Sequence, residues 1–185
     1  MKKSLITAVV LAACCAAPAA FAETRTDGDM GTLTINGLIE GTTCHFDSQA
    51  QSARIEMHQI GTDVIKGLTV GQAYDGYKNE TITPFKVSCD DAQDIPKLKF
   101  RPTEFHGTGE NGVTVIKEGG AEGVGYALLI NGDRINIDGS TPIALQKDPN
   151  GEYTFDIAAQ YARAPGENVS GGKVDSVVTF TVVAD

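Results

Sequence analysis

The sequence has no tryptophan, and aromatic residues make up only 6% of its 185 residues. So few rings argue against a platform on which nucleic-acid bases could stack. Positive charge is also scarce, since 15 Lys and Arg stand against 24 Asp and Glu and give a formal net charge of −9. Because binding to a phosphate backbone depends on clustered positive charge, the composition argues against a nucleic-acid partner.

The residue patterns of an active site or a metal centre are missing as well. The three histidines, His45, His58 and His106, do not have the spacing of metal ligands on one helix. No serine lies in a Gly-x-Ser-x-Gly motif. The glycine-rich segments 107–112 and 119–125 lack the Lys-Ser/Thr pair of a phosphate-binding loop. We therefore expect no enzyme activity, no metal and no cofactor.

A long apolar run occurs only within the first 22 residues. Two lysines precede this run, and it ends in small residues at Ala22. The run is too short to span a bilayer and is typical of a secretory signal peptide, with cleavage expected between Ala22 and Glu23. A lipoprotein signal with Cys14 as the lipidated residue is the alternative interpretation. Either way, the sequence predicts an exported chain.

Only two cysteines, Cys44 and Cys89, remain after the signal peptide. A single pair in an exported chain indicates a disulfide. It would close a loop of roughly 45 residues and contribute about 4 kcal/mol in the chain-entropy model. Two free buried thiols are the alternative, and a metal site is less favoured because neither cysteine has a second ligand at a metal-binding spacing.

The rest of the chain consists of short alternating runs separated by turn residues, which is typical of an all-β protein. About eight such strands in this length predict a β-sandwich, and no linker divides the chain into two domains. The segment 157–164 has the composition of a helix but also alternates, and its context favours a strand. The alternating runs are 32–35, 53–57, 82–89, 98–100, 113–116, 126–130, 134–137, 153–157 and 178–184.

Four stretches then form an ordered set. They are Gly31 to Gly37 (Gly-Thr-Leu-Thr-Ile-Asn-Gly), Thr83 to Cys89 (Thr-Pro-Phe-Lys-Val-Ser-Cys), Gly123 to Leu128 before the Asn131-Gly132 turn, and Tyr161 with the terminal Thr179 to Val182. In this order they resemble the subunits of chaperone–usher fimbriae, the type 1-like pilins of Gram-negative bacteria. The likeness covers essentially the whole chain after the signal peptide.

The resemblance implies an incomplete immunoglobulin-like β-sandwich that lacks its last strand. A donor strand from another subunit completes such a fold by β-strand addition. The implied organisation is a signal peptide at 1–22, a donor-strand extension at 23–37 and a pilin domain at 38–185. The residues expected on the inserted face of the donor strand are Asp29, Gly31, Leu33, Ile35 and Gly37.

The resemblance also implies the function and the partners. The chain would be a structural subunit that polymerises by donor-strand exchange, reaches the cell surface through the periplasm and supports adhesion. Its partners would be neighbouring pilin subunits, a periplasmic chaperone and an outer-membrane usher. An exported, monomeric β-sandwich binding module is the alternative function.

The C-terminal strand departs from the family pattern at one position. We expect Phe180, Val182, Ala184 and Asp185 to contribute to the groove and to the contact with the chaperone. Family members usually have a tyrosine as the next-to-last residue, whereas this chain has Ala184. The final strand keeps its alternation but loses its aromatic end.

Overall fold

The structure, a computed structural model, describes residues 31–39, 44–47, 51–91, 93, 95–107, 109–137, 142–166 and 168–184. Several positions that the sequence analysis singles out lie outside these described residues. They are the signal peptide 1–22 with Cys14 and Ala22, the residues Glu23 and Asp29 of the extension, and Asp185.

Strands dominate the described chain, which confirms the expected all-β fold class. The strands are β1 (Gly31–Ile39), β2 (Cys44–Phe46), β3 (Ser52–Met57), β4 (Ala73–Glu80), β5 (Phe85–Cys89), β6 (Pro96–Phe100), β7 (Phe105–His106), β8 (Val113–Thr114), β9 (Val124–Ile130), β10 (Asp133–Arg134), β11 (Ile143–Ala144), β12 (Tyr153–Phe155), β13 (Ile157–Arg163) and β14 (Asp175–Ala184). The helical elements are α1 (Thr62–Lys66) and the 3₁₀ turns η1 (Pro102–Glu104) and η2 (Gly109–Asn111). In the described part of the chain, no helix is long and apolar enough to cross a membrane.

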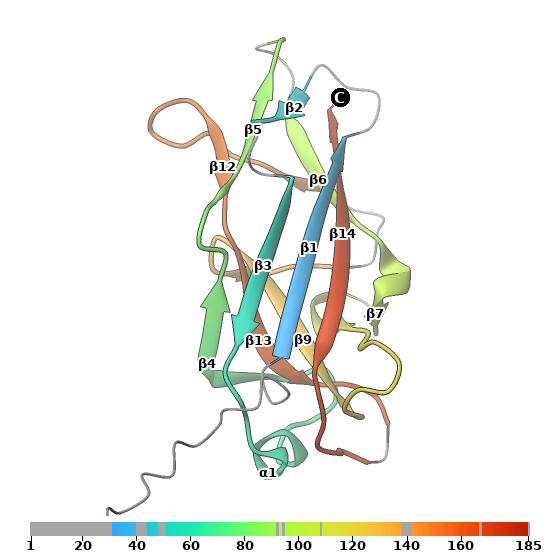
Figure 1. Cartoon of the computed structure of the whole chain (residues 1–185). Helices are drawn as coiled ribbons and strands as arrows, with labels where there is room; N and C mark the ends of the chain where they lie inside the picture. The colour runs from blue at the N-terminus through green and yellow to red at the C-terminus, as the bar shows by residue number, and fades with distance from the viewer. Residues whose placement is uncertain are drawn as a thin grey trace, which may run out of the picture.

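The strands form two main layers (Figure 1). One sheet has the strand order β11-β6-β14-β1-β3, and the sheet behind it has the order β10-β9-β13-β4. A smaller sheet, β12-β5-β2, lies at one end, and β7 pairs with β8. The side chains that these sheets point toward each other form one hydrophobic cluster, which is the core of the sandwich.

Along the last strand, β14, the residues of the apolar face are more deeply buried than the neighbours between them. Val178, Phe180 and Val182 are fully buried, while Val177 and Thr181 are only half-buried. One face of β14 therefore points into the core, as the sequence pattern predicts.

The segment of mixed helix and strand character is the strand β13. It lies in the middle of its sheet, between β9 and β4. The alanines of β13 give the segment its helix-like composition. They are buried, and Ala162 belongs to a second small hydrophobic cluster with Ala127 and Val113. Since β13 is buried on both faces, its outward positions hold small apolar residues in place of polar ones.

Several elements have no counterpart among the alternating runs of the sequence, and the longest of them are strand β4 and helix α1. Strand β4 is mostly polar, and its pairing with β13 shifts register between Gln160 and Ala162. The short helix α1 contributes one fully buried residue, Ile65. The strand expected at 134–137 is shorter than predicted, since its regular pairing ends at Arg134.

Candidate functional site: the groove that holds the first strand

Strand β1 contains all of the described part of the expected donor-strand extension, residues 31–37. It lies between β14 and β3 (Figure 1). It runs parallel to β14 and antiparallel to β3, so both edges of its backbone are paired. Ile35, for example, lies opposite Val178 of β14 and Ala53 of β3. The chain's own β1 therefore occupies the groove in this structure, whereas insertion into another subunit stays a prediction.

The two faces of β1 differ in burial. Leu33 and Ile35 are fully buried in the core, and Thr32 and Thr34, between Gly31 and Ile35, are half-buried on the other face. Burial of an aliphatic side chain of this size is worth roughly 1.5–3 kcal/mol. The strand thus contributes to the stability of the subunit to which it belongs.

Gly31, at the start of β1, lies beneath two buried tyrosines. Tyr126 donates a hydrogen bond from its hydroxyl to the carbonyl oxygen of Val174 at 2.5 Å. Tyr161 donates one to the carbonyl oxygen of His58 at 2.9 Å, and the two ring centroids lie 5.3 Å apart. A Cβ atom at Gly31 would overlap the Tyr126 hydroxyl oxygen and would lie 2.9 Å from that of Tyr161.

Burial affects the ionisation of both tyrosines. It raises the pKa of Tyr126 well above its usual range and raises the pKa of Tyr161 to about 12. Both hydroxyls therefore stay protonated at neutral pH and keep donating to the backbone. These hydrogen bonds hold the rings in place over the start of β1.

Gly37, near the other end of β1, faces a cluster of phenylalanines. It lies opposite Phe180 in the pairing with β14. A Cβ atom at Gly37 would lie 2.7 Å from Cζ of Phe46 and 2.9 Å from Cζ of Phe180. These two rings are buried, with centroids 5.9 Å apart, and Phe85 packs edge-on against Phe180 at 5.2 Å. The rings close this end of the groove to any larger side chain.

A cavity of about 260 Å³ opens beside the start of β1. Its lining combines apolar side chains such as Ile65 and Val174 with the polar Gln59 and Thr62. Gly31 forms part of its wall, so the cavity lies at this end of the groove.

The end of β14 borders the same groove. Phe180 and Val182 are fully buried, and Ala184 is half-buried opposite Pro96 of β6. Ala184 is thus paired into the sheet but supplies only a methyl group at the end of the strand. The role expected for this strand in chaperone binding stays a prediction.

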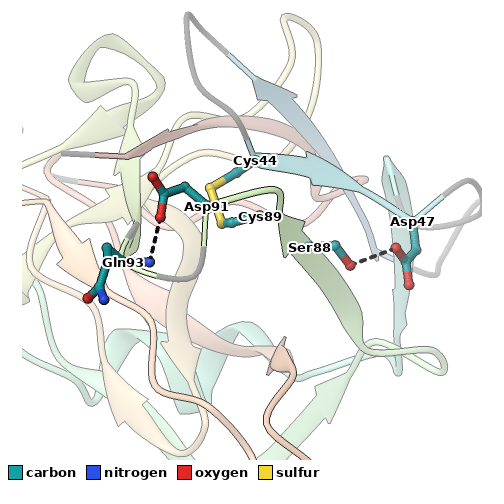
Figure 2. Close-up of a disulfide and its surroundings, with 6 residues drawn as sticks. All are labelled: Cys44, Asp47, Ser88, Cys89, Asp91 and Gln93. Carbon is teal, nitrogen blue, oxygen red and sulfur yellow. Dashed lines mark hydrogen bonds between the residues drawn. A yellow bond between two sulfur atoms is a disulfide. The ribbon is translucent and has the colours of Figure 1, made fainter.

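The predicted disulfide between Cys44 and Cys89 is present, with an S–S distance of 2.06 Å. The two cysteines lie directly opposite each other in β2 and β5 (Figure 2). Next to it, the Ser88 hydroxyl donates to Asp47 at 3.0 Å (Figure 2). The disulfide fastens β2, which carries Phe46 two residues further on, and so helps to fix the aromatic end of the groove.

The histidines lie on β2, on β7 and just after β3, and they do not form a site in the described residues. His45 and His106 are exposed on β2 and β7, and the ring of His58 stacks on Tyr77 at 5.0 Å. Within the described ranges, no group of three or more His, Cys, Asp or Glu side chains could hold a metal ion.

The sequence analysis identified the apolar face of β1 but missed the groups that face its two glycines. Tyr126 and Tyr161 lie within the matching motifs, yet no local pattern indicates that their hydroxyls meet at Gly31. Phe46, just after Cys44, was missed for the same reason. The contacts arise between residues that are far apart in the sequence, and only the fold brings them together.

Comparison with known proteins gives one full-length match. The chain is 27% identical over 187 residues to the uncharacterized fimbrial-like protein YehD of Escherichia coli (strain K12), and the match covers 100% of both chains. No protein-family model matches the chain. Among solved structures, the CupB6 tip adhesin from Pseudomonas aeruginosa aligns with a TM-score of 0.46 and 14% identity. That alignment covers 80% of this chain and 39% of the adhesin chain. The full-length similarity to a fimbrial-like protein supports the resemblance to fimbrial subunits that the sequence motifs predict.

Proposed function

We propose that this protein is a structural subunit of a surface fimbria and polymerises by donor-strand exchange. The observation that carries the proposal is the position of β1, a strand near the start of the chain that fills a groove between β14 and β3. Its inner face inserts two large apolar residues, Leu33 and Ile35, as a donated strand must. The full-length similarity to a fimbrial-like protein supports the same function.

In a fibre, the extension 23–37 of one subunit would fill the groove of the next. Such a contact joins two different surfaces of the subunit, so it is heterologous and does not close. Repetition of this contact produces a filament. The groove residues of β14, with Phe180 and Val182 at their centre, would then face a neighbour's strand in place of the chain's own β1.

Before assembly, the groove has to be protected. Removal of β1 leaves β14 and β3 with unpaired backbone edges and exposes the core side chains beneath Leu33 and Ile35. Exposed edges of this kind promote aggregation. We propose that a periplasmic chaperone supplies a strand at this stage, and that an outer-membrane usher passes the subunit to the surface. This role requires no catalytic activity.

The test is the behaviour of the purified protein on a denaturing gel without boiling. A donor-strand polymer is expected to run as a ladder of heat-resistant multimers and to collapse to one band after strong heating. The matched control carries Ile35→Asp, which places a charge at a buried donor position. A wild-type protein that gives a single monomer band, from cells that also express its chaperone and usher, would contradict polymerisation.

The position of β1 in its own groove also favours a second candidate function. A chain that completes its own sandwich has both edges of β1 paired and needs no neighbour for stability. It would act as an exported monomeric binding module, with lipidation at Cys14 as one version. This function predicts that β1 never exchanges with an external strand of the same sequence. Refolding of the urea-unfolded protein with an excess of a fluorescent peptide of residues Gly31–Ile39 tests this, and capture of the peptide would contradict the monomeric module.

A further inference from the structure

We propose that a pocket between β4 and the turn from β9 to β10 binds a neutral saccharide through its hydroxyl groups. The pocket has a volume of about 500 Å³, which is within the usual range for small-molecule sites. Its lining comes from the loop before β4 and from β4, η2, β9, β10 and β13. These elements do not include β1, β14 or β3, so the pocket is separate from the groove and its function does not depend on polymerisation.

The first polar group of the pocket is the guanidinium of Arg134, a half-buried side chain. Its Nη2 donates to the carbonyl oxygens of Gly71 at 2.8 Å and Gly112 at 3.3 Å, and these bonds hold the guanidinium in place. Among the described residues, neither Nη1 nor Nε has a hydrogen-bond partner, and Nε is buried. Because a buried polar atom without a partner is uncommon in folded proteins, this one indicates a place for a further polar group.

A second hydrogen-bond donor is fixed by its neighbours. The Oε1 atom of Gln72 accepts from the backbone N–H of Thr69 at 3.0 Å and from the Thr69 hydroxyl at 3.1 Å. These bonds occupy the oxygen and leave the amide NH₂ group, which can only donate, for a ligand. Gln72 and Arg134 therefore present donors that are already ordered, so a ligand loses less free energy by ordering them.

Acceptors line the same pocket. Asp75 and Asp133 are exposed, and an ionised carboxylate only accepts hydrogen bonds. The negative charge of Asp75 acts on Arg134, where it opposes the lowering of the pKa by burial. An anionic ligand would meet the two carboxylates, and a cationic ligand would meet the guanidinium. Neutral hydroxyl groups avoid both, and they satisfy donors and acceptors together because each hydroxyl can do both.

The pocket also has an apolar side. Val70 is 59% exposed, second only to Ile82 among the large apolar side chains of the described residues, and it lines the pocket together with Leu129 of β9. A saccharide ring combines an apolar face of C–H groups with hydroxyls at its edge. Such a ring can cover Val70 while its hydroxyls reach the polar groups, which removes apolar surface from water.

The experiment titrates the full chain with three neutral sugars, glucose, galactose and mannose, and with the uronic acid and the 2-amino sugar of each. NMR follows the side-chain N–H signals of Arg134, Gln72 and Asn111, which all line the pocket. At least one neutral sugar is expected to shift these signals, with a dissociation constant of about 1 mM or lower. Its anionic and cationic relatives are expected to bind about tenfold more weakly.

Two variants test the apolar side of the pocket. Val70→Asp is expected to weaken binding about tenfold or more, because the sugar ring then meets a hydrated carboxylate. Ile82→Asp is the matched control, since Ile82 is 97% exposed and lies outside the pocket, between β4 and β5. This variant is expected to bind like the wild type. Both variants should still give heat-resistant multimers, because neither position lies in the groove.

A third variant tests the reason for a neutral ligand. Asp75→Asn combined with Asp133→Asn removes both carboxylates and leaves the guanidinium of Arg134 in the pocket. It is expected to reverse the preference, so that the uronic acid binds more tightly than its neutral parent.

Three results would overturn the proposal. The first is that no neutral sugar shifts the signals of Arg134, Gln72 and Asn111 at about 100 mM, far above the expected dissociation constant. The second is equal weakening by Val70→Asp and Ile82→Asp, since the effect would then come from added charge anywhere on the surface. The third is tighter binding of the uronic acids by the wild type, which would make the pocket an anion site.

Discussion

Ile35 of β1 lies directly opposite Val178 of β14, and both side chains are fully buried. This pair joins a residue in the first described strand to one in the last. Because the contact is part of the subunit's own core, the strand that would be donated also stabilises the subunit that carries it. Any substitution on this face therefore acts on the folded monomer as well as on assembly.

A charge at Ile35 is expected to be far more damaging than the same charge one residue earlier. In Ile35→Asp, the carboxylate must either be buried without a partner or expel the strand from the groove. In Thr34→Asp, the side chain stays on the half-buried outer face. We expect Ile35→Asp to lower the urea midpoint of the monomer and to abolish heat-resistant multimers, whereas Thr34→Asp changes both only slightly. Equal yield and equal heat resistance of the two variants would contradict the insertion of this face.

Loss of the disulfide is expected to destabilise the subunit by about 4 kcal/mol, the value for a loop of this length in the chain-entropy model. Cys44 and Cys89 are separated by 45 residues and lie opposite each other in β2 and β5. Mass spectrometry of unreduced peptides should show the two cysteines joined, and urea unfolding of the Cys44→Ser, Cys89→Ser double variant measures the loss. Two alkylatable thiols in native exported protein would contradict the bond.

The sequence predicts the strands that have one buried face, such as β1 and β14, because an alternating pattern directly records which side faces the core. It does not predict β4, whose residues are mostly polar and whose pairing with β13 is irregular. It left β13 ambiguous, since a strand covered on both faces loses its polar positions. Local pattern therefore fails where burial is two-sided or where an edge strand is held by its neighbours.

The sequence likewise predicts one part of the candidate site and misses another. The apolar face of β1, with Leu33 and Ile35, could be predicted from its spacing alone. The obstacles at Gly31 and Gly37 could not, because they arise from rings of Tyr126 and Phe46 that are far away in the sequence. Likewise, no sequence pattern indicates that β1 lies in the chain's own groove and parallel to β14.

Stability is expected to fall in alkaline solution because of the buried tyrosines above Gly31. Burial raises the pKa of Tyr161 from 10.0 to about 12 and raises the pKa of Tyr126 as well. Between these values the unfolded chain loses tyrosine protons that the folded chain retains, so deprotonation favours unfolding. The contribution is fully present below about pH 10 and is lost as the pH rises through about 12.

Urea midpoints at about pH 8 and about pH 11 measure this effect. The Tyr161→Phe variant is the control, because it has one buried hydroxyl fewer to ionise. Its stability should fall less steeply with pH than that of the wild type. The same slope in both proteins would show that other groups cause the alkaline loss.

The last prediction concerns the direction of the donor strand. The inner face of β1 has almost the same order of sizes in both directions, with glycines at the ends and Leu33 and Ile35 between them. Strands can pair in parallel or antiparallel orientation, with different hydrogen-bond patterns but the same alternation of faces. The sizes alone therefore allow a strand that runs opposite to β1, with the residue equivalent to Gly37 beneath the tyrosines.

We expect a peptide with the reversed sequence, Gly-Asn-Ile-Thr-Leu-Thr-Gly, to be captured when the unfolded protein is refolded with an excess of it. Its affinity should be within about tenfold of that of the forward peptide Gly31–Gly37. A paramagnetic label at its N-terminus should broaden NMR signals near Val174 if it runs parallel to β14, and near Phe180 if it runs antiparallel. Antiparallel insertion is expected, because only that direction keeps the original order of Leu33 and Ile35 along the groove. The control exchanges Gly31 and Leu33, which keeps the composition but places leucine beneath Tyr126, and it should not bind. If the forward peptide binds and the reversed one does not, backbone direction selects the strand in addition to the sizes of its side chains.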